Sequence, residues 1–412
     1  MACAGYDVET LPPSDESSAD WGLKYANNEV CYPATLIVGD VIRAFRSGQY
    51  DPERCVVAMT QTGGQCRASS YVPIIKKALA DAGYGRTPVV SLTFGGSVDE
   101  AQAGLHVNWF KILPIALRTI LYTDCISKFY YASAVREKCP GQAHELKNAY
   151  LSRADALIRG GQSRRLLPLL AEAAADFNAI CREADCPQVG VVGEIFLKFN
   201  PFAQKRTIDW LTGQGIEVVP SALTDFFTQN FVNSRVRVAT DIERAVLPQF
   251  LYHLGYQAVS RQIRKANRMA SGFRYYKPLH DIFQEAREAE RVITLNAQFG
   301  EGWLLPAEVL GFARQGVRNV VSLQPFGCIA NHIVSKGVEK RIHQLCPDMN
   351  LLSLDFDSGV SDVNITNRLL LFTDHLKSSR HEPSGKVEMI RRRALWTPRG
   401  SCFCKRDMPP RA

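Results

Sequence analysis

The sequence lacks a long apolar run, a secretory leader and the two commonest nucleotide-binding signatures. No apolar stretch reaches the roughly 18 residues that a membrane-spanning helix needs. The N-terminal segment has neither a basic region nor an apolar region of the kind found in signal peptides. The absence of GxxxxGK[ST] excludes a P-loop ATPase, and the absence of GxGxxG after a strand counts against a dinucleotide-binding domain. We therefore expect a cytoplasmic protein that does not span a membrane.

Excess positive charge is also scarce outside one segment. The net charge is +8, but residues 377–412 alone hold ten Lys/Arg against three Asp/Glu. The rest of the chain holds 39 basic residues against 38 acidic ones. Such a neutral body does not favour nucleic-acid binding, because that function needs a basic surface. The basic tail is predicted to be disordered.

The composition that remains is that of an ordinary globular protein. The chain has 412 residues, of which 46% are hydrophobic and 22% charged. This length exceeds the usual size of one domain, so we expect two or three. A short strand at Cys55–Met59, an amphipathic helix at Tyr71–Gly83 and a strand at Thr87–Gly96 form a βαβ pattern. A βαβ unit implies a parallel sheet.

A helical stretch separates this unit from a second strand–helix series. Four further strands are predicted, at Gln188–Leu197, Ile216–Ser221, Val317–Cys328 and Asn350–Asp357, with helices at Pro33–Phe45, Arg206–Gly215 and Asn331–Leu345. The predicted fold is α/β, with two parallel-sheet lobes bridged by helices. Its parts are a first lobe (1–107), a helical bridging segment (108–185), a second lobe (186–376) and the basic tail (377–412).

Three of the twelve cysteines occupy similar local positions. Cys66 and Cys328 each follow a strand and a glycine, and Cys31 precedes a proline at a helix start. Ligands of parallel sheets bind at the carboxyl ends of strands, and glycine lets the backbone approach them closely. A helix N-terminus also favours thiolate. These cysteines could converge on zinc or an iron–sulfur cluster, leaving one coordination position open.

Other interpretations of the same residues stay open. Most cysteines of a cytosolic chain are inert core residues, and one of these three could instead be a catalytic nucleophile. His332, four residues after Cys328, is either its base or a surface or capping residue. Glu194, at a strand end, serves either acid–base chemistry or a hydrogen bond to a loop. The turn at Phe299–Leu305 could receive a phosphate.

Six segments, in order, carry a family resemblance. They are LKYANNEVCYPATLIVGD, TQTGGQCRASSYVPIIKKALADAG, VGVVGEIFLKFNPFAQ, FGEGWLLPAEVL, QPFGCIANHIVSKGVEKRI and LDFDSGVSDVNITNRLLLF. Together they resemble the C-terminal region of the large acyl-CoA dehydratase activase-related proteins, over about Gly5 to Lys377. That region is similar to the subunits of 2-hydroxyacyl-CoA dehydratases and double-cubane-cluster reductases.

The resemblance implies an oxygen-sensitive iron–sulfur protein of anaerobes. Two Rossmann-like lobes would hold a [4Fe-4S] or double-cubane-type cluster between them through Cys31, Cys66 and Cys328. An ATP-hydrolysing [4Fe-4S] activator would supply low-potential electrons, and the cluster would pass them to a substrate, in the best-understood members an acyl-CoA that loses water. Glu194 and His332 become candidates for proton handling. A homodimer or heterodimer is expected.

Two departures from the family pattern leave further alternatives. The activator-type ATPase region of the long family members is missing, and the chain starts late in the first lobe. We therefore expect a stand-alone module, a subunit of a split protein or a truncated reading frame, and whether it is an enzyme by itself stays open. The alternative functions are a docking or assembly module without chemistry of its own, and a zinc-stabilised α/β protein.

Overall fold

The chain is described here by a computed structural model that covers residues 5–27, 29–61, 66–91, 108–245, 248–359 and 361–378. The first two residues of the tail predicted to be disordered (377–412) belong to the helix Asp362–Ser378. The rest of the tail, and the end of the strand predicted at Thr87–Gly96, lie outside the described residues. No helix in these ranges is both long and apolar enough to cross a bilayer.

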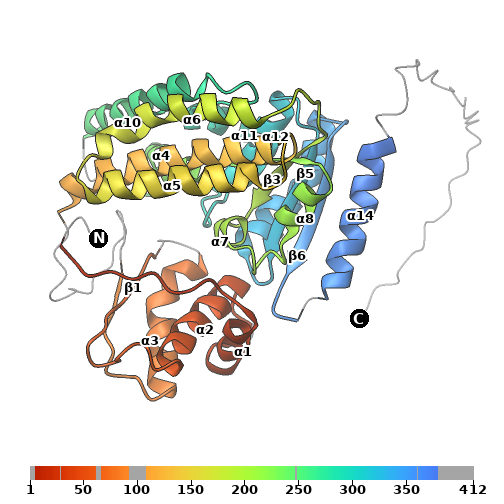
Figure 1. Ribbon diagram of the computed structural model, residues 1–412. Helices are drawn as coiled ribbons and strands as arrows, with labels where there is room; N and C mark the ends of the chain where they lie inside the picture. The colour runs from red at the N-terminus through yellow and green to blue at the C-terminus, as the bar shows by residue number, and fades with distance from the viewer. Residues whose placement is uncertain are drawn as a thin grey trace, which may run out of the picture.

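The N-terminal unit consists of three helices and a small parallel sheet (Figure 1). Its elements are α1 (Glu16–Tyr25), α2 (Tyr32–Arg46), β1 (Val57–Met59), a 3₁₀ turn (Arg67–Ser70), α3 (Tyr71–Asp81) and β2 (Val89–Ser91). Strands β1 and β2 pair in parallel, with Val57 opposite Val89. The βαβ prediction is therefore confirmed, although β1 is shorter than predicted.

A layer of long helices follows. It contains α4 (Trp109–Ala134), α5 (Gln142–Arg159) and α6 (Leu166–Ile180), and α9 (Leu223–Ala239) and α10 (Gln249–Ala270) pack against it. Its core includes the neighbouring rings of Phe129, Phe177 and Phe273. Helix α10 comes from the second half of the chain but lies beside α6 (Figure 1).

A second parallel sheet carries the rest of the molecule. Its strands are β3 (Gln188–Gly193), β4 (Glu217–Pro220), β5 (Asn319–Pro325) and β6 (Asn350–Phe356), in the order β4-β3-β5-β6. All three pairings are parallel, which confirms the predicted α/β class. The remaining helices are α7 (Ile195–Phe199), α8 (Thr207–Gly213), α11 (Ile282–Ala289), α12 (Leu304–Arg314), α13 (Glu339–Leu345) and α14 (Asp362–Ser378).

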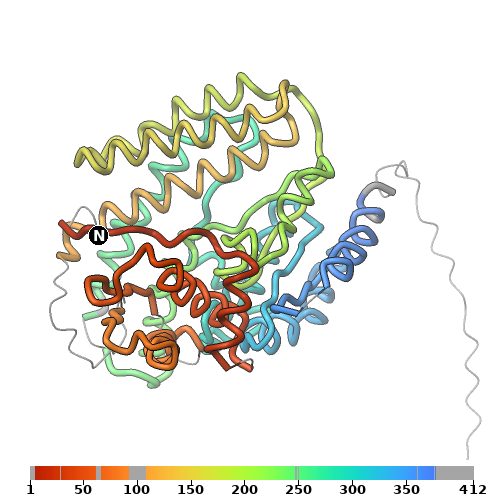
Figure 2. Tube along the Cα trace, turned by 60° about the horizontal axis from the view of Figure 1, so that its bottom comes forward, coloured from red at the N-terminus to blue at the C-terminus, as the bar shows by residue number. Residues whose placement is uncertain are grey.

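Helices cover both faces of this sheet, as a parallel sheet requires. On one face, side chains of α8 and α14, including Leu211 and Phe372, pack against β3, β5 and β6. On the other, Phe312 of α12 and Ile342 of α13 pack against Val192 and Val320. Both views show α14 on the side of the sheet away from the helical layer (Figures 1 and 2).

Two predicted elements differ from the structure. The strand predicted to reach Leu197 ends at Gly193, because this glycine has φ +128° and the next residues turn into α7. The helix predicted over Asn331–Leu345 is divided into a π-helix (Ala330–Ser335) and α13. Gly337 lies at the break, where its low helix propensity favours interruption.

Candidate functional site

Cys31 lies beside the turn that leads to Cys328. The backbone N–H of Tyr32 donates to the carbonyl of Phe326 at 3.1 Å, which joins the start of α2 to the end of β5. Gly327 then packs directly on Cys31, because a Cβ at position 327 would lie 3.1 Å from the Cα of Cys31. Two cysteines nearly three hundred residues apart in the sequence are thus brought together by their backbones.

Cys66 completes this group from the loop after β1. A Cβ on Gly300 would lie 3.5 Å from the Sγ of Cys66 and 3.9 Å from the Cβ of Ala330, two residues after Cys328. Cys66 is also close enough to Cys31 for a charge on one to raise the pKa of the other. The structure therefore brings together the segments that carry the three predicted cysteines, where the N-terminal unit meets the carboxyl edge of the second sheet.

Local sequence explains how each cysteine is held. Cys31 is the N-cap of α2, with extended backbone angles, and Pro33 fits the first helical turn. Gly327 has φ +75°, a left-handed conformation that lets the chain turn sharply before Cys328. Cys66 precedes the 3₁₀ turn that leads into α3.

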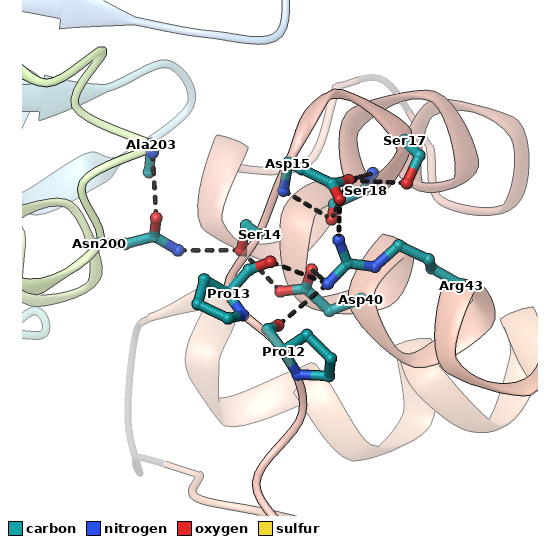
Figure 3. A network of polar contacts seen from close by, with 10 residues as sticks. All are labelled: Pro12, Pro13, Ser14, Asp15, Ser17, Ser18, Asp40, Arg43, Asn200 and Ala203. Carbon is teal, nitrogen blue, oxygen red and sulfur yellow. Dashed lines mark hydrogen bonds and ion pairs between the residues drawn. The ribbon is translucent and has the colours of Figure 1, made fainter. Parts of the chain in front are cut away.

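A polar network fixes α2, and with it Cys31, against the second sheet (Figure 3). Ser14 donates its hydroxyl to Asp40 of α2 at 2.7 Å, and Asn200, after α7, donates its amide to Ser14 at 2.9 Å. Arg43 of α2 donates to the carbonyls of Pro12 and Pro13 at 3.0 and 2.9 Å. The position of the Cys31 end of α2 therefore depends on contacts along the whole helix.

Burial favours the thiol form of two of the cysteines. It raises the pKa of Cys31 to about 12, and burial together with nearby Glu301 raises the pKa of Cys328. The expectation that a helix N-terminus would favour thiolate is therefore wrong for these two residues. The helical segment after Cys328 is short, and desolvation of the charged form outweighs any dipole effect. This environment also disfavours an activated catalytic thiolate.

Two polar side chains contact the thiols directly. Asn331 donates its side-chain N–H to the Sγ of Cys328 at 3.2 Å. Asn331 is fully buried, and its Oδ1 has no hydrogen-bond partner among the described residues. The hydroxyl of Tyr71, the first residue of α3, forms a hydrogen bond with the thiol of Cys31. Hydrogen bonds to sulfur are a means by which proteins tune clusters.

Glu194 and Glu301 lie in the same buried region. Glu194 caps α7, accepting the N–H of Leu197 at 3.0 Å, and Glu301 accepts the N–H of Ile195 at 2.8 Å. Burial raises the pKa of both carboxyl groups, and repulsion from Glu301 raises that of Glu194 further. The structure thus shows a hydrogen-bonding role for Glu194. Its charge also raises the pKa of Cys31 and Cys328, so it lies near both cysteines.

His332 occupies a more open position. Its backbone N–H donates to the carbonyl of Cys328 at 3.0 Å, but its imidazole Nδ1 lies 3.9 Å from Asp355. Lys336 also binds Asp355, at 2.8 Å. The side-chain partner of the Cys328 thiol is instead Asn331, one residue earlier.

Several residues of this site were not among the predicted candidates. Gly300 and Glu301 belong to the glycine-flanked turn that was interpreted only as a phosphate site. Asn331 follows Cys328 by three residues, a helical spacing that could have indicated a shared face. Tyr71 had no comparable signal, because its contact with Cys31 is formed only in three dimensions.

The donor set can be compared with the metal groups that thiols bind. Within the described ranges, no three His, Cys, Asp or Glu side chains are placed to hold a metal ion. A single zinc, with Zn–S of about 2.3 Å, needs its sulfurs within about 4 Å of one another. A four-iron cluster is larger and accepts cysteines that are spread more widely around it. Cys31 is buried, while Cys66 and Cys328 are partly exposed. Three soft donors that do not converge on a single ion fit a larger cluster better.

Comparisons with known proteins add no family assignment. No family model matches this chain, and a search of curated proteins finds no relative. The site is therefore interpreted from its own geometry and chemistry.

Proposed function

We propose that this chain is an iron–sulfur module that accepts low-potential electrons and passes them to a substrate. In this proposal Cys31, Cys66 and Cys328 hold a [4Fe-4S] or double-cubane-type cluster, and the electrons come from an ATP-hydrolysing activator. The sequence resemblance extends the proposal to an acyl-CoA as substrate and to a dimeric assembly. The observation that supports it is the approach of three cysteine-bearing segments that are distant in the sequence: Gly327, next to Cys328, packs on Cys31, and Cys66 lies close to Cys31.

The residues around the cysteines have separate roles in this proposal. A bound cluster would supply one-electron redox chemistry at low potential. Asn331 and Tyr71 donate hydrogen bonds to sulfur, which stabilises negative charge there. Gly327 and Gly300 give the loops a close approach to the cysteines. Glu194 and Glu301 are held beside the thiols by backbone hydrogen bonds, and burial raises the pKa of both carboxyl groups.

Metal content provides the first test. Protein purified without oxygen is assayed for iron, sulfide and zinc, and its visible absorption spectrum is recorded. We expect brown protein with about four irons per chain if one [4Fe-4S] cluster is bound. The Cys66→Ala variant is expected to lose iron and colour. Cys139→Ala is the matched control, because Cys139 is exposed and lies outside the site.

The other results would separate the alternatives. Colourless protein with stoichiometric zinc that is lost in Cys66→Ala would replace the electron-transfer proposal with a zinc-stabilised protein. Protein that stays metal-free after reconstitution would contradict ligation altogether. If the cluster is present, electron transfer from an activator and reduction of acyl-CoA thioesters are the next assays.

A docking function is the second candidate, and one observation favours it. Three apolar side chains around Cys328 are exposed: Phe326 by 50%, Ile329 by 49% and Ile333 by 63%. Exposed apolar side chains beside a site are typical of surfaces that bind another protein. If Ile333→Asp abolished binding of an activator but left iron content unchanged, these residues would serve docking. If iron were also lost, they would serve the fold of the site instead.

A further inference from the structure

A second group of charged side chains lies between the helical layer and the second sheet, where β4 ends. It surrounds a cavity lined by residues of four helices, among them Lys128 (α4), Asp225 (α9), Glu285 (α11) and Glu308 (α12), and by Gln315 just after α12. The cavity has about 30 Å³ of room for the centres of water-sized particles. That space holds about two such particles. None of these residues belongs to the cysteine site.

Oxygen atoms without partners face this cavity. Asp225 is 8% exposed, and within the described part of the chain its carboxylate makes no hydrogen bond or ion pair. Glu285 is 3% exposed; its Oε1 binds Arg314 and His280, but its Oε2 is buried without a partner. The Oε1 of Gln315 is likewise buried and unpartnered. Burying acceptors without donors costs free energy, so such oxygens indicate that a water or an ion binds here.

Gly311 makes room for this arrangement. A Cβ at position 311 would lie 2.8 Å from the Oε2 of Glu285, which is closer than atoms normally approach. The Nε2 of Gln315 donates to the carbonyl of Gly311 at 3.3 Å. The amide nitrogen therefore has a hydrogen-bond partner, whereas the amide oxygen has none among the described residues. The absence of a side chain at Gly311 thus allows the unpartnered Oε2 of Glu285 to lie close to α12.

Among the described residues, Asp225 is the cavity-lining carboxylate without an ion pair. Glu308 pairs with Lys198, and Glu285 pairs with Arg314 and contacts His280. Burial, and then repulsion from Glu308 and Glu285, raises the pKa of Asp225 well above its ordinary value, and the charge of Lys128 offsets only part of this effect.

We propose that this cavity binds one monovalent cation of about the size of water, potassium or ammonium, through Asp225, Glu285 and Gln315. A single positive charge matches the one lining carboxylate that has no ion pair among the described residues, Asp225. Divalent calcium takes six to eight oxygen ligands and magnesium requires strict octahedral geometry. The described part of the chain has no three acidic, His or Cys side chains placed for such an ion. The bound cation would hold α9, α11 and α12 together at the end of β4.

Thermal unfolding of the full chain tests this proposal. Potassium, ammonium, sodium and choline chlorides are compared at equal ionic strength. We expect Tm to rise saturably by about 2–4 °C in potassium or ammonium relative to choline, because a ligand that binds only the folded state stabilises it. Crystals soaked in rubidium should show an anomalous peak in the cavity. No dependence on the cation, or an ordered water only, would overturn the proposal.

Variants connect the effect to the cavity. Asp225→Asn and Gln315→Met should lose the rise in Tm, and the second variant removes an oxygen donor without changing charge. Asp20→Asn, at an exposed position of α1, is the matched control and should keep the rise in Tm. A rise that persists in both cavity variants would place the cation elsewhere and contradict the proposal. If Asp225→Asn does not fold, Gln315→Met and the rubidium peak in wild type still test whether the cavity binds the cation.

Discussion

Single residues determine whether the three cysteines can meet. Gly327 is the clearest example, since it combines a left-handed conformation with direct contact against the backbone of Cys31. A larger residue there would be strained and would also push α2 away from Cys328. The chemistry of the site therefore depends on a residue that has no side chain.

Gly327→Ala should reduce both stability and metal content. The left-handed conformation costs a non-glycine residue about 1–2 kcal/mol. In addition, the new Cβ would lie 3.1 Å from the Cα of Cys31, which separates the cysteines. Urea unfolding and iron content of oxygen-free preparations measure the two effects.

Gly316→Ala is the matched control for this variant. Gly316 also has a positive φ, +80°, but a Cβ there would meet no atom within 4 Å. It should lose similar stability and keep its iron. Equal iron content in both variants would show that the contact with Cys31 does not position the site.

At the scale of elements, α1 and α2 pack with their backbones in contact. A Cβ at Gly39 of α2 would lie only 1.7 Å from the carbonyl oxygen of Ser18, and one at Gly22 of α1 only 2.1 Å from that of Thr35. The two glycines therefore set the distance between the helices. Because α2 begins just after Cys31, this distance also affects the cysteine site.

Gly39→Ala is expected to destabilise the N-terminal unit. Overpacking at such contacts costs about 1–3 kcal/mol, which exceeds the gain in helix propensity from alanine. Urea unfolding measures the loss. Gly213→Ala, at the end of α8 with open space around it, should be neutral or stabilising. A stable Gly39→Ala protein would mean that α1 can move away at little cost.

The buried carboxyl of Asp40 makes this helix pair sensitive to pH. Burial raises its pKa above 3.8, despite hydrogen bonds from Ser18 and Ser14 and the charge of Arg43. The folded state therefore holds the proton more tightly than the unfolded state does. The stability from Asp40 is complete below pH 3.8 and is lost as pH rises through the raised pKa.

Asp40→Asn should remove this pH dependence. Between pH 4 and pH 7 the free energy of unfolding of wild type should fall relative to that of the variant, as measured by urea unfolding at each pH. Asp20→Asn, at an exposed position of α1, should show the same pH dependence of the free energy of unfolding as wild type. A constant difference between wild type and Asp40→Asn would show that Asp40 titrates alike in both states.

The elements differ in how well sequence predicts them. Apolar periodicity located α2, α3, β4 and β6 because each buries one continuous stretch against its own neighbours. It failed after Gly193, where Ile195 and Leu197 are apolar but turn into a helix. Cys66 and Cys328 could be singled out from local glycine–cysteine patterns, and Cys31 from the proline at the helix start that follows it. Tyr71 could not, because its role depends on packing between elements.

At the scale of the whole molecule, one buried ion pair joins the helical layer to the second sheet. Arg136, just after α4, donates to Glu217 at the start of β4 at 2.7 Å, and both side chains are at most 3% exposed. Arg136 also donates to the carbonyls of Ala132 and Ala184 at 2.7 and 2.9 Å, and it stacks on Tyr275. Its guanidinium therefore connects the layer, the sheet and the loop between them.

Arg136→Met should be among the most destabilising single substitutions in this protein. It leaves Glu217 buried without its counter-charge, at a cost of about 3–5 kcal/mol. Arg153→Met is the matched control, because Arg153 pairs with Glu172 on the surface, where solvent screens the interaction. Urea unfolding should show a large loss of stability for the first variant and little for the second.

The double variant Arg136→Met/Glu217→Met should recover part of the loss, since no unpaired charge remains. If it recovered nothing, the hydrogen bonds of Arg136 to backbone carbonyls, and not its charge, would hold the layer to the sheet.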